Sequence, residues 1–112
     1  MNKEIKDKWV AALRSGNYIQ GHGTLSKNNL YCCLGVLCDL AVKEGICKIQ
    51  PNGLGGESIQ YDNNRSFLPD SVMKWAELDD YSPSINGVDL SNINDSGSHT
   101  FNDIADLIEK HL

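Results

Sequence analysis

The feature that most constrains the fold is one largely apolar segment in the middle of the chain, residues 31–44. Its apolar side chains cover more than one stripe of a helix, which indicates burial on two sides. Gly45 follows as a helix stop, and Asp39 is an acidic exception that needs solvent or a partner. We therefore predict a central buried helix over residues 31–44. Its apolar positions are Cys33, Leu34, Val36, Leu37, Leu40 and Ala41.

Three further helices are predicted around this one. The first follows the N-cap Asn2 and ends at Gly16, with apolar residues at helical spacing between them. Another opens at Leu68-Pro69-Asp70, with Asp70 as its expected cap. The last starts at Thr100, and Asp103 three residues later completes a variant of the capping box. A helical turn is also expected at residues 91–94.

Short strands are expected between the helices. Candidates are residues 18–20, 47–49 and 59–61, and Asn86-Gly87 between two aliphatic residues is a strong hairpin signal. The prediction is an α+β fold: a small single globular domain over residues 1–112, with about four helices and short antiparallel hairpins. The sequence leaves open whether the Gly-rich segment 52–57 is a mobile lid.

The distribution of charge excludes several partners. The net charge is -5, the first helix carries Lys3, Lys6, Lys8 and Arg14, and residues 79–112 contain seven acidic residues and one lysine. A chain without a basic stripe is a poor ligand for nucleic acid or for an anionic membrane surface. The segregated charges favour either head-to-tail self-association or two solvated faces, and a homo-oligomer is therefore one expectation.

The first residues of the chain and its cysteines predict the cellular compartment of the protein. Residues 1–9 are charged and amphipathic, without the apolar run of a signal peptide, and no segment reaches transmembrane length. The four cysteines are then most simply reduced thiols, and Cys32 and Cys33 are neighbours that would form a strained disulfide. We expect a cytoplasmic protein.

The cysteines also suggest two kinds of chemistry. Cys32 or Cys33 opens the central helix, where the helix dipole stabilises a thiolate, and His99 could act as the base of a cysteine hydrolase. The alternative is that both are small buried residues of the core. A zinc site is the second possibility, because Cys38, Cys47 and His22 would supply further ligands beside Cys32 and Cys33. The sequence, however, lacks the Cys-x2-Cys pair that is typical of zinc sites. We therefore expect no catalytic residue, no metal site and no cofactor.

One polar dipeptide, Asn94-Asp95, has two interpretations. It follows a helical turn and precedes Ser96-Gly97, a setting in which Asx side chains fold back on the backbone. Contact with a ligand is the other interpretation, and the sequence does not decide between them.

The chain resembles a family of small proteins in bacteriophage and prophage genomes. The specific part is the run YCCLGVLCDL at residues 31–40, and the resemblance extends over the whole chain through Leu68-Pro69, Trp75, Asn94-Asp95 and Ile104-Ala105-Asp106. The resemblance implies a phage context rather than a defined activity. His22 and His99 lie outside the family pattern, which argues against a family-wide Cys-His enzyme.

The resemblance and the residue types together predict a ligand-binding site. Gln20, Cys32, Asn94 and Asp95 match the family pattern and are the candidates for a shared site. Tyr18, Tyr61 and Trp75 could stack on a base, and Arg65 could pair with a phosphate. The predicted ligand-binding residues are Tyr18, Gln20, Cys32, Arg65, Asn94 and Asp95.

By analogy with other small phage proteins, the leading hypothesis is a small-molecule-binding protein of the bacterial host cytosol that sequesters a nucleotide immune signal. The alternatives are a cysteine-dependent hydrolase or transferase that uses Cys32 or Cys33, and a module that binds a host protein.

Overall fold

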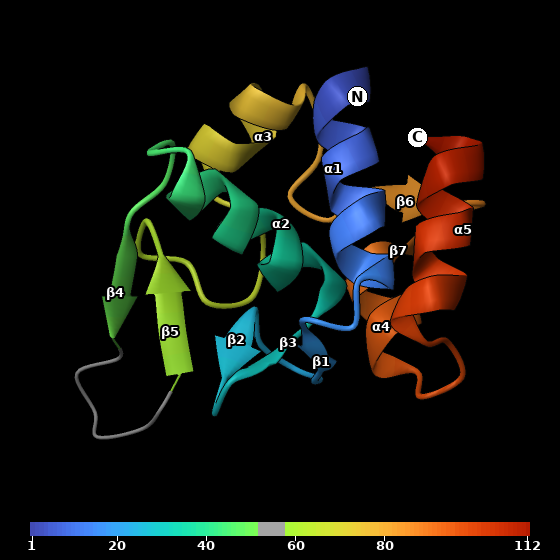
Figure 1. Ribbon diagram of the computed structural model, residues 1–112, viewed down its shortest axis with the longest axis horizontal. Helices are drawn as coiled ribbons and strands as arrows, with labels where there is room; N and C mark the ends of the chain where they lie inside the picture. The colour runs from blue at the N-terminus through green and yellow to red at the C-terminus, as the bar shows by residue number, and fades with distance from the viewer. Residues whose placement is uncertain (52–57) are drawn as a thin grey trace.

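The computed structural model describes residues 1–51 and 58–112, so the question of a lid over residues 52–57 lies outside the described residues. The described part of the chain contains five helices and seven short strands, and the predicted α+β class is confirmed (Figure 1). The helices are α1 (Lys3–Arg14), α2 (Cys33–Lys43), α3 (Asp70–Ala76), α4 (Leu90–Asp95) and α5 (Phe101–His111). The strands are β1 (Ile19–Gln20), β2 (Ser26–Lys27), β3 (Leu30–Tyr31), β4 (Ile49–Pro51), β5 (Ser58–Tyr61), β6 (Ser84–Ile85) and β7 (Val88–Asp89).

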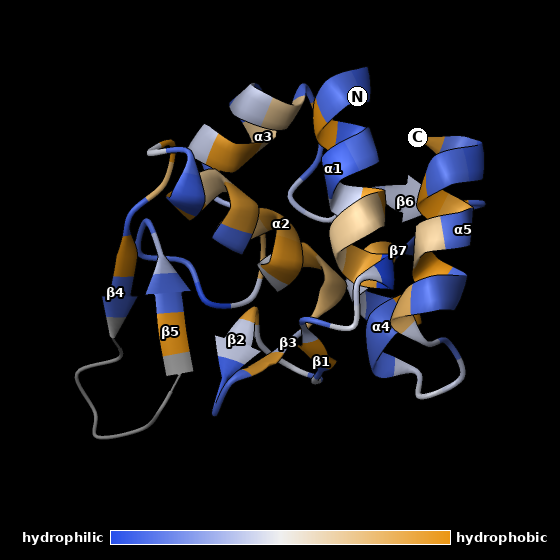
Figure 2. Cartoon of the chain, viewed as in Figure 1, coloured by the Kyte–Doolittle hydropathy of each residue, from blue (hydrophilic) through white to orange (hydrophobic). Residues whose placement is uncertain are grey.

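Helix α2 is the centre of the molecule, as the apolar run predicts. Most of its side chains are buried, and Figure 2 shows it as the most continuously hydrophobic helix. The helix lies so close to the loop before β2 that a Cβ on Gly35 would overlap the Leu25 carbonyl oxygen. The same carbonyl accepts a hydrogen bond of 3.1 Å from the Cys32 backbone N–H. Gly35 therefore allows the start of α2 to pack directly on backbone.

Helices α1 and α5 lie side by side, with the two chain termini at the same end of the molecule (Figure 1). Trp9 of α1 is fully buried, and its indole N–H donates to the Cys33 carbonyl at 2.9 Å, which fixes α1 against the start of α2. Two of the three predicted N-caps are confirmed: the Asn2 side chain accepts from the Ile5 N–H, and Thr100 and Asp103 form the capping box of α5.

The larger sheet has the strand order β1-β3-β2-β5-β4. Strands β1 and β3 are parallel, a pairing that the sequence did not predict, beside the expected antiparallel hairpins. Strands β2 and β3 were not predicted; Asn28 and Asn29 join them with φ values of 54° and 63°, a backbone conformation that asparagine tolerates better than most residues. The expected strands near residues 47–49 and 59–61 are β4 and β5, an antiparallel pair.

Three further details of the prediction can be compared with the structure. The Asn86-Gly87 hairpin is confirmed as β6–β7, with φ values of 53° and 81° at the two turn residues. The expected turn at residues 91–94 is a helix, α4, which raises the number of helices from about four to five. Asp70 is not a cap: α3 has Pro69 at its N-cap position without a side-chain hydrogen bond, and Asp70 is its first residue. None of the helices in the described ranges has the length and apolar character to cross a membrane.

Candidate functional site

Asn94 of α4 is the centre of a closed polar cluster. Its side chain is fully buried, and its Oδ1 atom accepts from Gln20 Nε2 at 3.1 Å and from the Cys33 N–H at 3.2 Å. Its Nδ2 atom donates to the Gly21 carbonyl at 2.9 Å and to Asp95 Oδ1 at 3.0 Å. These bonds use both amide protons and two acceptor positions of Asn94. The residue therefore joins α4, β1 and the start of α2 through bonds to distant segments, rather than folding back on the backbone of its own turn.

Two other predicted residues belong to the same cluster. Gln20 Nε2 also donates to the His99 carbonyl at 3.0 Å, so its amide nitrogen is turned inward. Asp95 is exposed, and its Oδ1 atom accepts from the Gly23 N–H at 3.1 Å in addition to Asn94. Asp95 thus links the closed cluster to the surface.

Cys32 is the N-cap of α2. Its Sγ atom accepts from the Gly35 N–H at 3.4 Å, and burial raises the pKa of this thiol to about 11. Cys33 is also buried; its Sγ donates to the Leu90 carbonyl at 3.7 Å, and burial raises its pKa. Desolvation therefore outweighs the backbone hydrogen bonds that lower the pKa at both positions, and both thiols are protonated at neutral pH. Neither thiol is hydrogen-bonded to His99: the Cys32 and Cys33 sulfur atoms pair with backbone groups, and His99 Nδ1 pairs with Ser98 Oγ at 3.0 Å.

Two clefts open beside this cluster. The Cys32 cleft has a volume of about 230 Å³ and is lined by Gly23, Thr24, Cys32, Ser66, Phe67, Ser91, Asn92 and Asp95. The Tyr81 cleft has a volume of about 490 Å³ and is lined by Asp62, Asn64, Phe67, Leu68, Pro69, Asp70, Ser71 and Tyr81. Phe67 lines both, so the two clefts are adjacent.

Exposed aromatic rings distinguish this surface. The Phe67 side chain is 48% exposed and Tyr81 is 57% exposed. The two segments are held together, because the Leu68 N–H donates to the Tyr81 carbonyl at 3.0 Å. Large aromatic side chains left in water beside polar groups are characteristic of binding surfaces.

Carboxylates set the electrostatic character of the Tyr81 cleft. Asp62 accepts hydrogen bonds from the Ser71 hydroxyl and from the Lys48 N–H, and these bonds lower the pKa of its carboxyl group. Asp70 lies exposed in the same lining. The cleft therefore favours hydrogen-bond donors such as amines and hydroxyls over a phosphate group.

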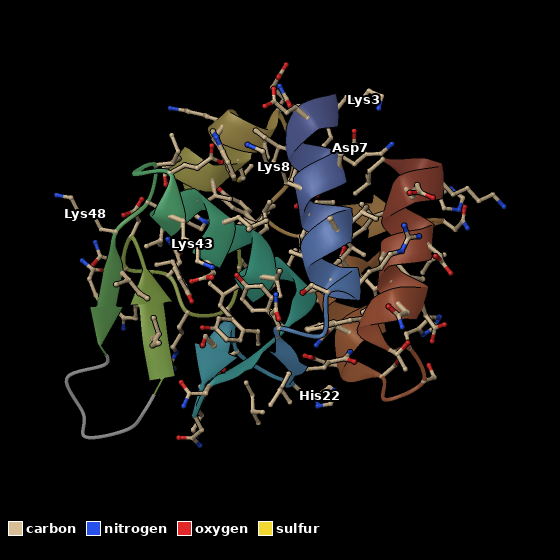
Figure 3. All side chains as sticks on the ribbon, viewed as in Figure 1. Lys3, Asp7, Lys8, His22, Lys43 and Lys48 are labelled. Atoms are coloured by element: carbon tan, nitrogen blue, oxygen red, sulfur yellow. The ribbon has the colours of Figure 1, made fainter. Side chains whose placement is uncertain are left out.

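The remaining predicted residues lie outside both clefts. Tyr18 donates its hydroxyl to Asp39 and accepts from Lys43 Nζ at 3.2 Å, and burial raises its pKa. This is the partner that Asp39 needed, and Lys43 is labelled on α2 in Figure 3. Arg65 is exposed, and its carbonyl accepts from the Leu25 N–H at 2.6 Å. Tyr61 is fully buried, so its ring is not available for stacking.

The structure thus brings together Gln20, Cys32, Asn94 and Asp95. Tyr18 lies with Gln20 in a third cleft of about 260 Å³ between the end of α1 and the start of α5, and Arg65 lines neither the Cys32 cleft nor the Tyr81 cleft. The sequence interpretation missed Phe67 and Tyr81. A signal was present, because Phe67 follows the polar run Asn63 to Ser66 and Tyr81 follows Asp79-Asp80, so each aromatic ring comes from a segment without apolar periodicity.

Fold and site together define a small α+β domain with paired surface clefts and a closed polar cluster behind them. The chain belongs to the family described as a domain of unknown function, DUF8296, which matches residues 1–112. No curated protein and no solved structure matches the chain. Within the ranges 1–51 and 58–112, no group of three or more His, Cys, Asp or Glu side chains is placed to hold a metal ion.

Proposed function

We propose that this is a non-enzymatic protein that binds a small molecule across Phe67, with parts of the ligand in the Cys32 cleft and in the Tyr81 cleft. The observation that carries the proposal is that one exposed aromatic ring is shared by two adjacent clefts. Their volumes of about 230 and 490 Å³ suit a ligand with a flat ring and a polar substituent.

The lining favours a nucleoside-like ligand. A heteroaromatic ring would stack on Phe67, a contact worth about 1–3 kcal/mol for a base. Hydroxyl or amino groups of the ligand would donate to Asp70 on one side or to Asp95 on the other. A phosphate would be repelled by these carboxylates and would instead lie towards Arg65, which is exposed two residues before Phe67.

The phage resemblance gives this binding a biological role. A protein that binds the nucleoside part of a signalling nucleotide in the cytosol of a bacterial host would sequester that signal, which is the counter-defence role expected from the sequence. Sequestration needs a binding site and no catalytic group, and the protonated state of Cys32 and Cys33 is in keeping with it.

The binding experiment is native mass spectrometry of the purified protein with adenosine, ADP-ribose and cyclic dinucleotides. We expect a saturable mass increase equal to one intact ligand per chain, and a loss of about tenfold or more in affinity for Phe67→Ala. Ile49→Ala is the matched control, because Ile49 is 46% exposed and lines neither cleft. The proposal would be contradicted if none of the compounds increased the mass of the protein, or if Phe67→Ala bound them as tightly as the wild type.

The cysteine-dependent enzyme is the second candidate, because Cys32 lines a cleft. Its thiol pKa of about 11 predicts slow alkylation by iodoacetamide at pH 7.5, with a rate that rises about tenfold for each pH unit up to pH 10. The measurement is the alkylation rate of Cys32 against pH by peptide mass spectrometry. Fast labelling at pH 7.5 that is lost in Cys32→Ala would favour the enzyme.

A further inference from the structure

The Tyr81 cleft carries negative charge that no cation of the protein pairs with in residues 1–51 and 58–112. None of the six ion pairs in these ranges involves Asp62 or Asp70, the two aspartates that line the cleft. Lys48 donates its backbone N–H to Asp62, but its side chain points away from the molecule (Figure 3). Of the described residues that line the cleft, none is a lysine, arginine or histidine. The charge is therefore open to a cation from outside the chain.

The two aspartates of this cleft differ in their hydrogen bonds. Asp62 is held by the protein, because its Oδ1 atom accepts from the Lys48 N–H at 2.9 Å and its Oδ2 atom accepts from the Ser71 hydroxyl. Asp70 is exposed, and within the described part of the chain its carboxylate takes part in no hydrogen bond. Asp70 can therefore offer both carboxylate oxygens to a ligand, whereas Asp62 supplies a fixed negative charge in the same lining.

Two aromatic rings indicate which kind of cation the cleft accepts. Phe67 and Tyr81 are 48% and 57% exposed and line the same cleft as the aspartates. The face of an aromatic ring attracts an organic cation that packs against it. A metal ion would instead need several oxygen ligands, and no group of three or more His, Cys, Asp or Glu among the described residues is placed to hold one. Aromatic faces beside carboxylates therefore favour an organic cation.

The shape of a guanidinium group suits these partners best. Its flat face stacks on an aromatic ring, while its N–H groups bind both oxygens of one carboxylate. An ammonium group would pair with the same carboxylate as a point charge, with fewer directed bonds. The cleft volume of about 490 Å³ holds either group with several carbon atoms attached. The expected order of affinity is a guanidinium, then an ammonium, then a neutral group of the same shape.

We propose that the Tyr81 cleft binds an organic cation, a guanidinium or alkylammonium group, which pairs with Asp70 and packs on the faces of Phe67 and Tyr81. This inference rests on the proposed function and deepens it. That function needs a hydrogen-bond donor at the end of the ligand that enters the Tyr81 cleft, and the inference adds that this donor carries a positive charge. A nucleoside-like ligand would carry the cation as an amino or guanidino substituent.

The experiment compares two small probes of the same shape and different charge. Butylguanidinium and the neutral butylurea are titrated at low salt into the ¹⁵N-labelled protein, and ¹H–¹⁵N correlation spectra follow the backbone N–H groups of Phe67, Asp70 and Tyr81. We expect saturable shifts at these residues with butylguanidinium. Its dissociation constant should be lower than that of butylurea by at least about tenfold, because only the cation makes charge-assisted bonds.

Variants then test the two kinds of contact. Asp70→Asn keeps the shape of the side chain and removes its charge, and it should weaken butylguanidinium binding by about five- to tenfold. Asp79→Asn is the matched control, because Asp79 is exposed and does not line the Tyr81 cleft, and its effect should stay below about twofold. Tyr81→Leu removes an aromatic face and should weaken binding by about two- to fivefold. The spectra also show whether each variant is folded.

The inference would be overturned if butylurea bound as tightly as butylguanidinium, or if Asp70→Asn and Asp79→Asn weakened binding equally. The two proposals also fail in distinguishable ways. Binding of adenosine without binding of butylguanidinium would overturn the cation site and leave the proposed function. Binding of butylguanidinium without binding of any nucleoside or nucleotide would overturn the nucleoside-like ligand and leave the cleft as a site for an organic cation.

Discussion

The polar cluster around Asn94 and the clefts around Phe67 lie side by side and share Asp95, yet their side chains are used in opposite ways. Asn94 is fully buried and its amide group is hydrogen-bonded to protein groups, whereas Phe67 is half exposed and lines two clefts. The comparison teaches that polar residues that look like a ligand site in the sequence can serve the fold, while the neighbouring surface carries the proposed binding site.

The physical difference lies in what each region does to stability. A fully hydrogen-bonded buried amide fixes one arrangement of the surrounding backbone, and its loss leaves buried groups without partners. An exposed aromatic ring adds little to stability, because it keeps most of its contact with water. Substitutions should therefore separate the two regions by their effect on the free energy of unfolding.

The largest effect is expected from Gly35→Ala, at the start of α2, the helix to which Asn94 is bonded through the Cys33 N–H. In an ordinary helix this change stabilises by up to about 1 kcal/mol. Here the new Cβ overlaps the Leu25 carbonyl oxygen, so α2 must move away, and we expect a loss of about 3 kcal/mol. Urea denaturation measures the change. A gain in stability would mean that the start of α2 does not pack directly on Leu25.

The next effect is expected from Asn94→Ala. The substitution leaves the Cys33 N–H and the Gly21 carbonyl without their partner, and each buried unpaired group costs about 1–3 kcal/mol. We expect a total loss of about 2–4 kcal/mol by urea denaturation. The matched control is Asn92→Ala, an exposed position on the same helix, with an expected change within about 0.5 kcal/mol. Equal effects at both positions would show that the cluster is not a structural unit.

Most of the fold could be predicted from the sequence because its signals are local. The apolar run of α2, the caps at Asn2 and Thr100 and the Asn86-Gly87 turn each act within a few residues, and each is confirmed. The parallel pairing of β1 with β3 could not be predicted, since it joins two-residue strands through long-range contacts and has no periodicity of its own.

The candidate site was predicted only in part. Gln20, Cys32, Asn94 and Asp95 do come together, but the sequence could not show that Asn94 is saturated by internal bonds or that burial raises the pKa of Cys32. Both properties depend on how distant segments pack. The exposure of Phe67 also depends on how distant segments pack. It could not be predicted, because an aromatic residue in a sequence is by default expected in the core.

A smaller, pH-dependent effect on the free energy of unfolding is expected at Asp62, which lines the Tyr81 cleft. Its pKa is lowered in the folded state, chiefly by the Ser71 hydroxyl and then by the Lys48 N–H. Its contribution to stability is therefore present above the unfolded pKa of about 3.9 and is lost as the pH falls through the lower folded pKa. Thermal unfolding of the wild type and of Asp62→Asn between pH 2 and pH 7 measures this. The stability gap between the two proteins should narrow below pH 4, and a gap that stays constant would contradict the assignment.

The smallest effect on stability is expected at the centre of the clefts. Phe67→Ala should change the free energy of unfolding by less than about 1 kcal/mol, well below the 3–5 kcal/mol typical of a phenylalanine in a core, because the ring is half exposed. Urea denaturation of this variant beside Leu68→Ala makes the contrast within one segment, since Leu68 is buried and should cost about 2–5 kcal/mol. Similar losses at both positions would show that Phe67 supports the core, and the proposed binding surface would then lose its central residue.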